Sequence, residues 1–395
     1  MTEANRGAFG ESRSTDTPDD RPLRVLFMLT SRQWGGNEKW TLLAARGLLD
    51  RGHDVTVLWS HGVIRDELSR RGIPGRRVRL WGDVNPVGLA WLCRHIMATR
   101  PDVLVLTKQR EYWMGGAAAR IVGRPFVALR LGLRRRLRDD LKRRLAFGRF
   151  ADAIIVNSPA VRDALLESEW LEPSKIALIE NGVPTDPVEP ARVEGALRRV
   201  GAPRGGPVVL GAGRLSKQKG FDVLIDAFAS VLERAPNAHL VIAGSGNDME
   251  KLRRRAEGLG IAESVTLPGH VDDVRALMAG ADVYALSSRN EGMANALLEA
   301  MSVGCAIVAT DVSGTVQAVR DGKEALVVPP EDVGALAEAL VRLLSDADLR
   351  EELGAAALER ARARFGVERM LDEVEELFRR GAGRRTGYPA RRREI

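Results

Sequence analysis

Short runs of Val, Ile and Leu alternate with longer amphipathic segments along most of the chain, from Arg24 onward. In the first half these runs are RVLFML, DVTVLW, VLVLT, FVALR, AIIVNS and IALIE, with a weaker run near Val78. Apolar runs of this length, each followed by a turn or by helix-like sequence, are typical of βα units that form a parallel sheet. The pattern therefore predicts the α/β fold class.

A second series of the same kind follows a break in the pattern. Its runs are PVVLGAG, HLVIAGSG, SVTLPG, DVYALSS, AIVAT and ALVVPP. The break, GVPTDPVEPARVEGALRRVGAPRGGP, is crowded with Pro, Gly and charged residues, as interdomain linkers are. A chain of 395 residues is long enough for two domains. Doubly wound sheets bind ligands at the carboxyl ends of their strands, so we expect the active site in a cleft between two such edges.

Composition and charge exclude several classes of protein. No uncharged apolar run reaches the length of a membrane span, and the polar start, MTEANRGAFGESRSTDTPDDRP, lacks a signal-peptide core. We expect a cytoplasmic protein with a disordered leader. The net charge of +7 comes from two segments, residues 130–150 and the tail from Arg379, so no uniform nucleic-acid-binding surface is indicated. Cys93 and Cys305 lie in apolar patterns and suit buried packing.

The segment GAGRLSKQKGFDVLIDAF, which begins at Gly211, combines features that suit a diphosphate. Two glycines allow close backbone approach, and Arg214 and Lys219 follow as cations that can bind phosphate oxygens. The simpler alternative is a βα turn with two solvated cations. The segment is not an NAD fingerprint, because the third glycine of G-x-G-x-x-G is missing here and in GSGNDM.

The stretch SSRNEGMANALLEAMSVG places Glu291 in a loop and Glu299 in the first turns of a helix. In a continuous helix, eight residues rotate ~80° beyond two turns and would splay the two carboxylates, whereas a loop start lets both approach one ligand. The free N–H groups around Met293 to Asn295 can form an anion site. The alternative is a polar helix cap with a surface glutamate.

Four motifs in fixed order now resemble a known family. GRLSKQKGFDVLIDAF, AGSGNDMEKLR, LPGHVDDV and EGMANALLEAMSVGCAIVATDVSG are similar to the C-terminal domain of the retaining GT-B glycosyltransferases of family 4. GGNEKW, VNSPAVRDAL and IENGVP in the first half fit the same family. The resemblance covers roughly residues 24–380 and implies two Rossmann-like domains that face each other across a cleft.

The resemblance also implies roles for individual residues. Arg214 and Lys219 would clamp the diphosphate of a nucleotide-sugar donor, Glu291 would lie near the donor sugar, and these three residues form the expected catalytic set. Glu299 would bind the ribose hydroxyls, and the stretch from His270 to Asp272 would border the base. The full set of binding residues that the resemblance implies is Gly35, Gly36, Gly213, Gly244, Gly246, His270, Val271, Gly292, Met293, Ala294, Asn295 and Glu299.

Two positions depart from the family pattern. Many relatives carry histidines at the end of the fifth strand and after the fourth, where this chain has Arg130 and, in TKQ, Lys108. We therefore carry over no catalytic histidine, include Arg130 and Lys108 as cleft residues, and expect a different or more anionic acceptor or sugar contact. The one D-x-D, Asp346 and Asp348, lies between two late helices and favours a helix cap over a metal site. We predict no metal and no other cofactor.

The basic segment from residue 130 to 150 predicts an amphipathic helix. Leu133, Leu137, Leu141 and Leu145 recur every four residues between Arg and Lys. Such a helix can lie on an anionic leaflet, which would make the protein peripheral at the inner face of the membrane. The plain alternative is that the leucines pack on the first sheet and the arginines face water.

The leading hypothesis is a retaining, metal-independent glycosyltransferase that moves a sugar from a nucleoside diphosphate to a glycan, lipid-linked or small-molecule acceptor, in cell-envelope polysaccharide or glycolipid synthesis. A GT-B epimerase of nucleotide sugars is one rival, and a non-catalytic protein that binds nucleic acid or a lipid surface is another. We do not expect nucleic acid as a partner. The expected division of the chain is 1–22 leader, 23–182 acceptor domain, 183–206 linker, 207–364 donor domain, 365–380 a helix that crosses back to the first domain, and 381–395 a basic disordered tail.

Overall fold

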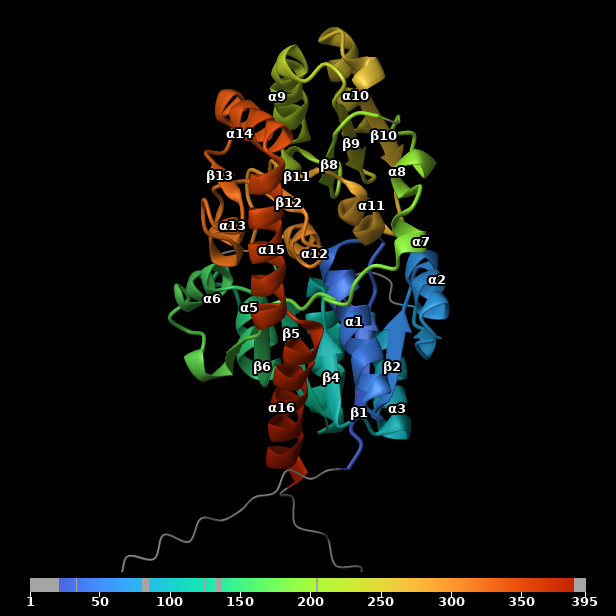
Figure 1. Cartoon of the computed structure of the whole chain (residues 1–395). Helices are drawn as coiled ribbons and strands as arrows, with labels where there is room; N and C mark the ends of the chain where they lie inside the picture. Colours follow the sequence, from blue (N-terminus) through green and yellow to red (C-terminus); the bar gives the residue numbers. More distant parts are fainter. Residues whose placement is uncertain are drawn as a thin grey trace, which may run out of the picture.

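The computed structural model describes residues 21–386 except 33, 80–84, 124, 133–136 and 204. Residues 1–20 of the predicted leader and residues 387–395 of the predicted basic tail lie outside the described residues. Figure 1 shows two α/β units stacked one above the other, with two long helices, α15 and α16, running along one side of both. The fold class predicted from the sequence is confirmed.

The first unit is built on a seven-stranded parallel sheet of order β3-β2-β1-β4-β5-β6-β7. Six of its strands coincide with the apolar runs of the sequence: β1 Arg24–Leu29, β2 Asp54–Trp59, β4 Val103–Leu106, β5 Phe126–Leu131, β6 Ala153–Val156 and β7 Ile176–Leu178. The seventh, β3 Gly75–Arg77, is an exposed Gly-Arg-Arg segment just before the weaker run near Val78. The helices of this unit are α1 Gly36–Asp50, α2 Gly62–Arg70, α3 Pro86–Thr99, α4 Gln109–Val122, α5 Leu141–Arg143, the π-helix Arg144–Phe150 and α6 Pro159–Leu166, and a 3-10 turn spans Pro173–Lys175.

The second unit has a six-stranded parallel sheet of order β10-β9-β8-β11-β12-β13. Its strands are β8 Val208–Ala212, β9 His239–Ala243, β10 Val265–Gly269, β11 Val283–Leu286, β12 Ala306–Thr310 and β13 Leu326–Val328. Its helices are α9 Phe221–Arg234, α10 Met249–Gly258, α11 Val274–Gly280, α12 Asn295–Met301, α13 Ser313–Ala318, α14 Val333–Ser345 and α15 Ala347–Arg364, with 3-10 turns at Lys217–Lys219 and Ala262–Ser264.

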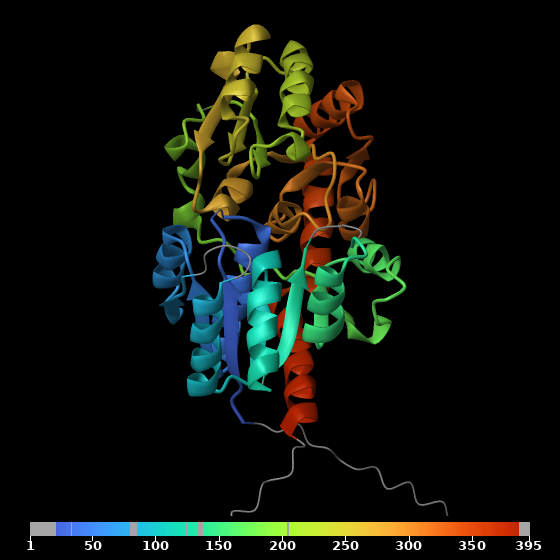
Figure 2. The same ribbon diagram turned by 180° about the vertical axis from the view of Figure 1, so that it is seen from behind.

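Both sheets are covered by helices on their two faces, which explains why the strands read as continuous apolar runs. Along β1, Val25, Phe27 and Leu29 join the core under α1, α2 and α16, whereas Leu26 and Met28 join the core under α3, α4 and α6. The second sheet divides its two cores in the same way. Helices thus surround each sheet, as the view from behind in Figure 2 also shows, and leave the carboxyl ends of the strands for a site.

The chain passes from one unit to the other at two places, here called crossings, near residues 183 and 366. The segment between them contains two short helices, α7 Pro190–Val193 and α8 Ala196–Arg199, and Ala196 is buried in the core of the second unit. Near residue 183 the first crossing meets the second: the Val183 N–H donates to Phe365 O at 2.8 Å, and the Val367 N–H donates to Val183 O at 3.1 Å. Paired backbone bonds of this kind hold the chain crossings together where the units meet.

The last helix, α16 Val367–Thr386, packs on the first unit although it follows the second in sequence. Met370, Leu371, Val374 and Phe378 belong to the core under α1. A Cβ at Gly47 of α1 would lie 2.3 Å from Leu371 Cδ1, so the close approach of these two helices depends on that glycine. Burial of this apolar face ties the two units into one molecule.

The amphipathic helix predicted for residues 130–150 is present only from Leu141 onward. Residues 137–140 are not helical, α5 begins at Leu141, and the turn that follows is of π type. The Asp140 carboxylate accepts the Arg143 N–H at 2.8 Å and so starts the helix late. Leu137 joins the core under α3 and α4, and Phe147 and Phe150 contact Tyr112 and Trp113, whereas Leu141 is 73% exposed.

Other sequence interpretations concern caps, cysteines and membrane spans. Asp346 caps α15 by accepting the Leu349 N–H at 2.9 Å, which confirms the cap interpretation of the D-x-D sequence. Cys305 is buried, whereas Cys93 is only half-buried. No helix in the described part of the chain is long and apolar enough to cross a membrane.

Candidate active site

The loops after β8 and β9 lie against each other at the carboxyl edge of the second sheet. The Gly213 N–H donates to Ala243 O, and the Leu215 N–H donates to Ser245 O, both at 3.0 Å. A Cβ at Gly244 would lie 1.8 Å from Gly213 O, and one at Gly246 would lie 2.1 Å from Leu215 O. Gly213 and Gly244 have φ of +154° and +155°, a region that L side chains rarely adopt. Glycine is therefore required where these two loops meet.

Arg214 projects from this loop toward the first unit. A Cβ at Gly35, directly before α1, would lie 3.1 Å from Arg214 Nη2. Arg214 is exposed, and within the described residues no carboxylate pairs with it. The guanidinium is thus an uncompensated cation at the junction of the two units.

Lys219 and Glu291, which the sequence places far apart, form an ion pair. Lys219 Nζ lies 2.5 Å from Glu291 Oε1, and the Ser288 hydroxyl donates to the same oxygen at 2.8 Å. Both ionised side chains are largely buried. The pair joins the phosphate-binding loop predicted after β8 to the glutamate loop after β11.

Arg289 fixes the backbone that carries Glu291. Its guanidinium bonds to the Asp222 carboxylate at 2.7 and 3.0 Å and to Lys217 O at 2.7 Å, and it also pairs with Glu331. Hydrogen bonding to Asp222 and then to Glu331 raises the pKa of Arg289, so it stays charged. The loop between β11 and α12 is therefore anchored on α9.

Glu299 lies in α12 and is paired across the junction. Lys39 Nζ of α1 donates to Glu299 Oε1 at 2.8 Å, with the glutamate side chain 12% exposed and the lysine 38% exposed. Met293 and Ala294, before the helix, are buried, and no side chain caps its N-terminus. Glu291 and Glu299 thus contact lysines from opposite sides of the junction.

Asn295, the first residue of α12, belongs to a chain of polar contacts between the units. Its Nδ2 donates to Gly36 O at 3.2 Å, and its Oδ1 accepts from Asn181 Nδ2 at 2.5 Å. Asn181 Oδ1 in turn accepts from Arg130 Nη2 at 2.6 Å. This Arg130 relay, defined as Arg130, Asn181 and Asn295, connects the end of β5 to the start of α12.

Arg130 is a buried cation without a carboxylate partner among the described residues. It also donates to Leu131 O and lies over the Trp40 ring, with 4.6 Å between Cζ and the ring centroid. Burial lowers the pKa of Arg130 to about 10, so the group is still charged at neutral pH. An aromatic face and amide oxygens stabilise this charge in place of an anion.

Lys108 approaches the same region from the loop after β4. Its Nζ lies 2.5 Å from Glu38 Oε1, and a Cβ at Gly35 would lie 3.1 Å from Glu38 Oε2. The fully buried Glu111 accepts the N–H groups of Thr30, Thr107 and Lys108 at 2.6, 2.6 and 2.8 Å. Burial raises the pKa of Glu111. Glu111 therefore holds the loops after β1 and β4 together.

The predicted base-bordering stretch lies at the side of the junction. His270 is exposed and its Nε2 lies 3.3 Å from Asp272 Oδ1, while Val271 is half-buried against the core of the second unit. Arg70 Nη1 of α2 pairs with the same aspartate at 3.0 Å. Gly292 approaches the first unit, since a Cβ there would lie 2.8 Å from Gly132 O.

The predicted residues thus gather around one junction, between the loops after β8, β9 and β11 and the start of α1. Sequence reasoning missed Lys39, Asn181 and Arg289 as members of this site. Lys39 could have been identified from the sequence, because it lies inside the GGNEKW motif. The pairing of Asn181 with Asn295 could not, because it depends on the fold. Among the described residues, no group of three His, Cys, Asp or Glu side chains could hold a metal ion.

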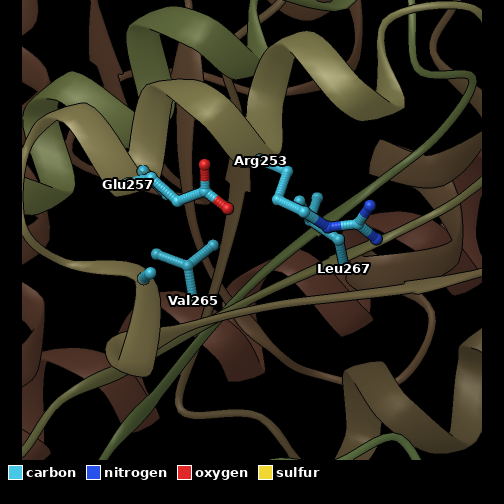
Figure 3. Close-up of a pocket in the computed structure, with 6 residues that line it drawn as sticks. Arg253, Glu257, Val265 and Leu267 are labelled. Atoms are coloured by element: carbon cyan, nitrogen blue, oxygen red, sulfur yellow. The ribbon is translucent and has the colours of Figure 1, made fainter.

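A surface pocket of about 220 Å³ lies elsewhere, between α10 and β10. Figure 3 shows Arg253 and Glu257 above Val265 and Leu267 in this pocket. It contains none of the predicted site residues.

Comparisons with protein families support the same assignment for both halves of the chain. The family described as Glycosyltransferase Family 4 matches residues 34–187, and Glycosyl transferases group 1 matches residues 195–360. The D-inositol 3-phosphate glycosyltransferase of Acidothermus cellulolyticus is 30% identical over 398 residues, which are 90% of this chain and 88% of that protein.

Two further relatives match over shorter regions. The lipopolysaccharide core biosynthesis glycosyltransferase LpsE of Rhizobium meliloti is 31% identical over 60% of this chain and 67% of its own length. The phosphatidyl-myo-inositol mannosyltransferase of Mycobacterium leprae is 40% identical over 47% of this chain. The match spans about half of the mannosyltransferase, 48%.

Solved structures share the fold over nearly the whole chain. A glycosyltransferase from Rickettsia africae superposes with a TM-score of 0.80 at 19% identity and covers 91% of this chain and 98% of its own. Anabaena Alr3699/HepE in complex with UDP and glucose superposes with a TM-score of 0.79 at 23% identity and covers 90% and 99%. At these identities the likeness concerns the fold alone.

Proposed function

Because the chain belongs to glycosyltransferase family 4, the glycosyl transferases group 1, we propose that it is a retaining enzyme that moves a sugar from a nucleoside diphosphate to an acceptor hydroxyl. The observation that carries this proposal is the gathering of Arg214, Lys219, Glu291 and Glu299 at the junction with the Gly35–Gly36 turn.

The donor would replace contacts that now exist within the protein. Its diphosphate would lie between Arg214 and Lys219, because these cations flank the glycine-rich loops where a backbone can approach closely. Its ribose hydroxyls would donate to Glu299, in exchange for the ion pair with Lys39. The sugar would lie near Glu291, whose carboxylate is held by Ser288 and Lys219.

Charge development explains why these residue types are needed. Cleavage of the anomeric C–O bond leaves an additional negative charge on the diphosphate and oxocarbenium character on the sugar. Fixed cations and N–H dipoles stabilise the first, and the carboxylate of Glu291 stabilises the second. Attack from the leaving-group face lets the donor phosphate accept the proton of the acceptor hydroxyl, so no protein base is required.

The acceptor and the setting of the reaction are part of the same proposal. Names of relatives include lipopolysaccharide core, D-inositol 3-phosphate and phosphatidyl-myo-inositol. We place the enzyme in the synthesis of an envelope polysaccharide or glycolipid, at the inner face of the membrane. The exposed Leu141 and the neighbouring basic residues of α5 are consistent with contact to an anionic lipid surface.

The first experiment is a thermal-unfolding screen with UDP, GDP and ADP. UDP is the first candidate because the Anabaena neighbour was solved with it. A specific ligand at a hundred times its Kd stabilises by about 2.7 kcal/mol. We expect one nucleotide to raise the Tm of the wild type but not the Tm of Arg214→Ala. Arg94→Ala, on the exposed face of α3, is the control and should respond as the wild type does. No stabilisation by any nucleoside diphosphate would contradict the proposal.

A further inference from the structure

Two parallel contacts join the first turn of α1 to the first turn of α12. Asn295 Nδ2 donates to Gly36 O at 3.2 Å, and Lys39 Nζ donates to Glu299 Oε1 at 2.8 Å. Asn295 and Glu299 are four residues apart, so they lie on one side of α12. The proposed function places the donor beside Gly36 and Glu299, and the relative position of these two turns therefore shapes the donor site.

Only one of the two contacts would persist with the donor bound. The ribose hydroxyls would replace Lys39 at Glu299, as proposed above, whereas the side chain of Asn295 has no part in that exchange. The bond from Asn295 to Gly36 O would then hold the two turns together. Its geometry is tight, since a Cβ at Gly36 would lie 3.0 Å from Asn295 Nδ2 and would press on this amide.

Arg130 fixes the orientation of the Asn295 amide through Asn181. A guanidinium group only donates hydrogen bonds, so Asn181 Oδ1 must accept from Arg130 Nη2, at 2.6 Å. The amide nitrogen of Asn181 is then left to donate to Asn295 Oδ1, at 2.5 Å, and Asn295 Nδ2 faces Gly36 O. The charge at one end of the Arg130 relay thus decides which atom of Asn295 meets Gly36.

The relay also returns to α1 at its other end. The Arg130 guanidinium lies over the ring of Trp40, which follows Gly36 by one helical turn, with 4.6 Å between Cζ and the ring centroid. Arg130 and Asn181 are buried, so water has little access to their bonds. The contacts therefore form a closed ring from α1 through β5, the loop after β7 and α12 back to α1.

Stability alone does not explain a buried cation in this ring. Replacement of a whole buried polar network by apolar residues is often neutral or stabilising, because burial of a charge costs free energy. Within the part of the chain that the structure describes, Arg130 Nε and Trp40 Nε1 are buried without a hydrogen-bond partner. A polar network that is kept in spite of this cost points to a role in the order of the site.

We infer that Arg130 and Asn181 are positioning residues for glycosyl transfer, which hold the start of α12 against the start of α1 through Asn295 while the donor is bound. This inference rests on the proposed function and gives Arg130 an indirect role, in place of a contact with the acceptor or the sugar. Displacement of a reacting group by about 1 Å can cost ~10²-fold in rate. Loss of the relay should therefore lower kcat more than it lowers donor affinity.

The test begins with Asn181→Asp and Asn181→Ala. The aspartate still accepts from Arg130 but cannot donate to Asn295, so Asn181→Asp breaks the relay while the buried cation keeps a partner. Activity is the release of nucleoside diphosphate from its α-linked glucose and mannose derivatives, with water as acceptor in one arm and glycerol 3-phosphate in the other. Calorimetry gives the Kd of the nucleoside diphosphate, and the Tm of each variant without ligand shows whether it folds.

We expect kcat to fall ~10- to 100-fold in both Asn181 variants. The Kd of the nucleoside diphosphate should change by less than about threefold, because the cations and Glu299 of the donor site are kept. Asp346→Ala is the control for lost stability, since it removes the hydrogen bond that caps α15 outside the junction. This variant should lower Tm and leave kcat at the wild-type value.

The double variant Arg130→Met/Asn181→Ala separates a relay from a direct contact. If Arg130 acts only through Asn181, the kcat of the double variant should lie within about twofold of that of Asn181→Ala, because the effects of residues in one network do not add. A further fall in kcat would mean that Arg130 meets the substrate itself, and this result would overturn the inference.

Other results bear on the inference or on the proposed function separately. Wild-type kcat in both Asn181 variants would limit the relay to a structural role and overturn the inference, while the proposed function stands. A fall in kcat that Asp346→Ala shares equally would trace to stability and would also overturn it. If the wild type releases no nucleoside diphosphate and no nucleoside diphosphate raises its Tm, the proposed function fails, and the inference fails with it.

Discussion

The ion pair between Lys39 and Glu299 makes the ribose role of Glu299 testable. In the ligand-free protein, Lys39 Nζ holds Glu299 Oε1 at 2.8 Å across the junction. If the ribose hydroxyls bind this carboxylate, the donor must displace the lysine. Lys39→Met removes the competitor with little change of volume, and Glu299→Gln removes the charge with little change of shape.

The structure gives a magnitude for each change. The lysine side chain is 38% exposed, so the pair is expected to contribute ~0.2–1 kcal/mol, and its removal should tighten nucleoside diphosphate binding by up to ~5-fold. A hydrogen bond to an ionised group contributes ~1.5–3 kcal/mol, so Glu299→Gln should weaken binding by ~10- to 150-fold. In the double variant, Lys39→Met should have no further effect.

Isothermal titration calorimetry with the nucleoside diphosphate measures these affinities, and thermal unfolding without ligand controls for folding. Lys323→Met, at an exposed turn, is the matched control for loss of a lysine. Weaker binding in Lys39→Met, with Glu299 present or absent, would mean that Lys39 contacts the donor itself. Unchanged affinity in Glu299→Gln would refute the ribose role.

Three further predictions concern turnover, stability and pH. Arg214→Ala and Lys219→Ala should each lower kcat by ~10²-fold, because each removes one stabiliser of the leaving diphosphate, and near-normal turnover in both would reject the clamp. Arg130→Met leaves the oxygens of Leu131 and Asn181 without their donor and should cost about 1–3 kcal/mol in urea unfolding, so an unchanged midpoint would contradict the relay. Burial lowers the pKa values of His53, His95 and His239. The unfolded chain therefore binds protons more readily, so Tm should fall as pH drops below ~6.5, and His53→Gln should reduce this slope.

Most strands could be predicted from the sequence because the central strands of each sheet are buried on both faces, whereas the exposed edge strand β3 has no apolar pattern of its own. Runs such as VLVL at residues 103–106 have no other plausible environment, and each of them became a strand. The loops after β9 and β11 were also predictable, since Gly244 follows β9 directly and Glu291 lies in the loop that follows β11. The roles and the domain limits assigned from the resemblance stay predictions.

Contacts between distant segments could not be predicted in the same way. Nothing local to Asn181 shows that it lies between Arg130 and Asn295, because that arrangement depends on how the two units meet. At residues 137–150 the local pattern itself was misleading. Leucines spaced by four favour a helix, but the Asp140 cap and the packing of Phe147 against Tyr112 determine where the helix begins and which side faces inward.

The stereochemistry of the product tests the central claim most directly. The enzyme is incubated with an α-linked sugar derivative of the nucleoside diphosphate that raises Tm, together with phosphorylated and unphosphorylated polyol acceptors. The anomeric proton of the product is then followed by NMR. The account predicts an α-linked glycoside and one nucleoside diphosphate released per transfer. A β-linked product, or an epimerised nucleotide sugar without transfer, would contradict it.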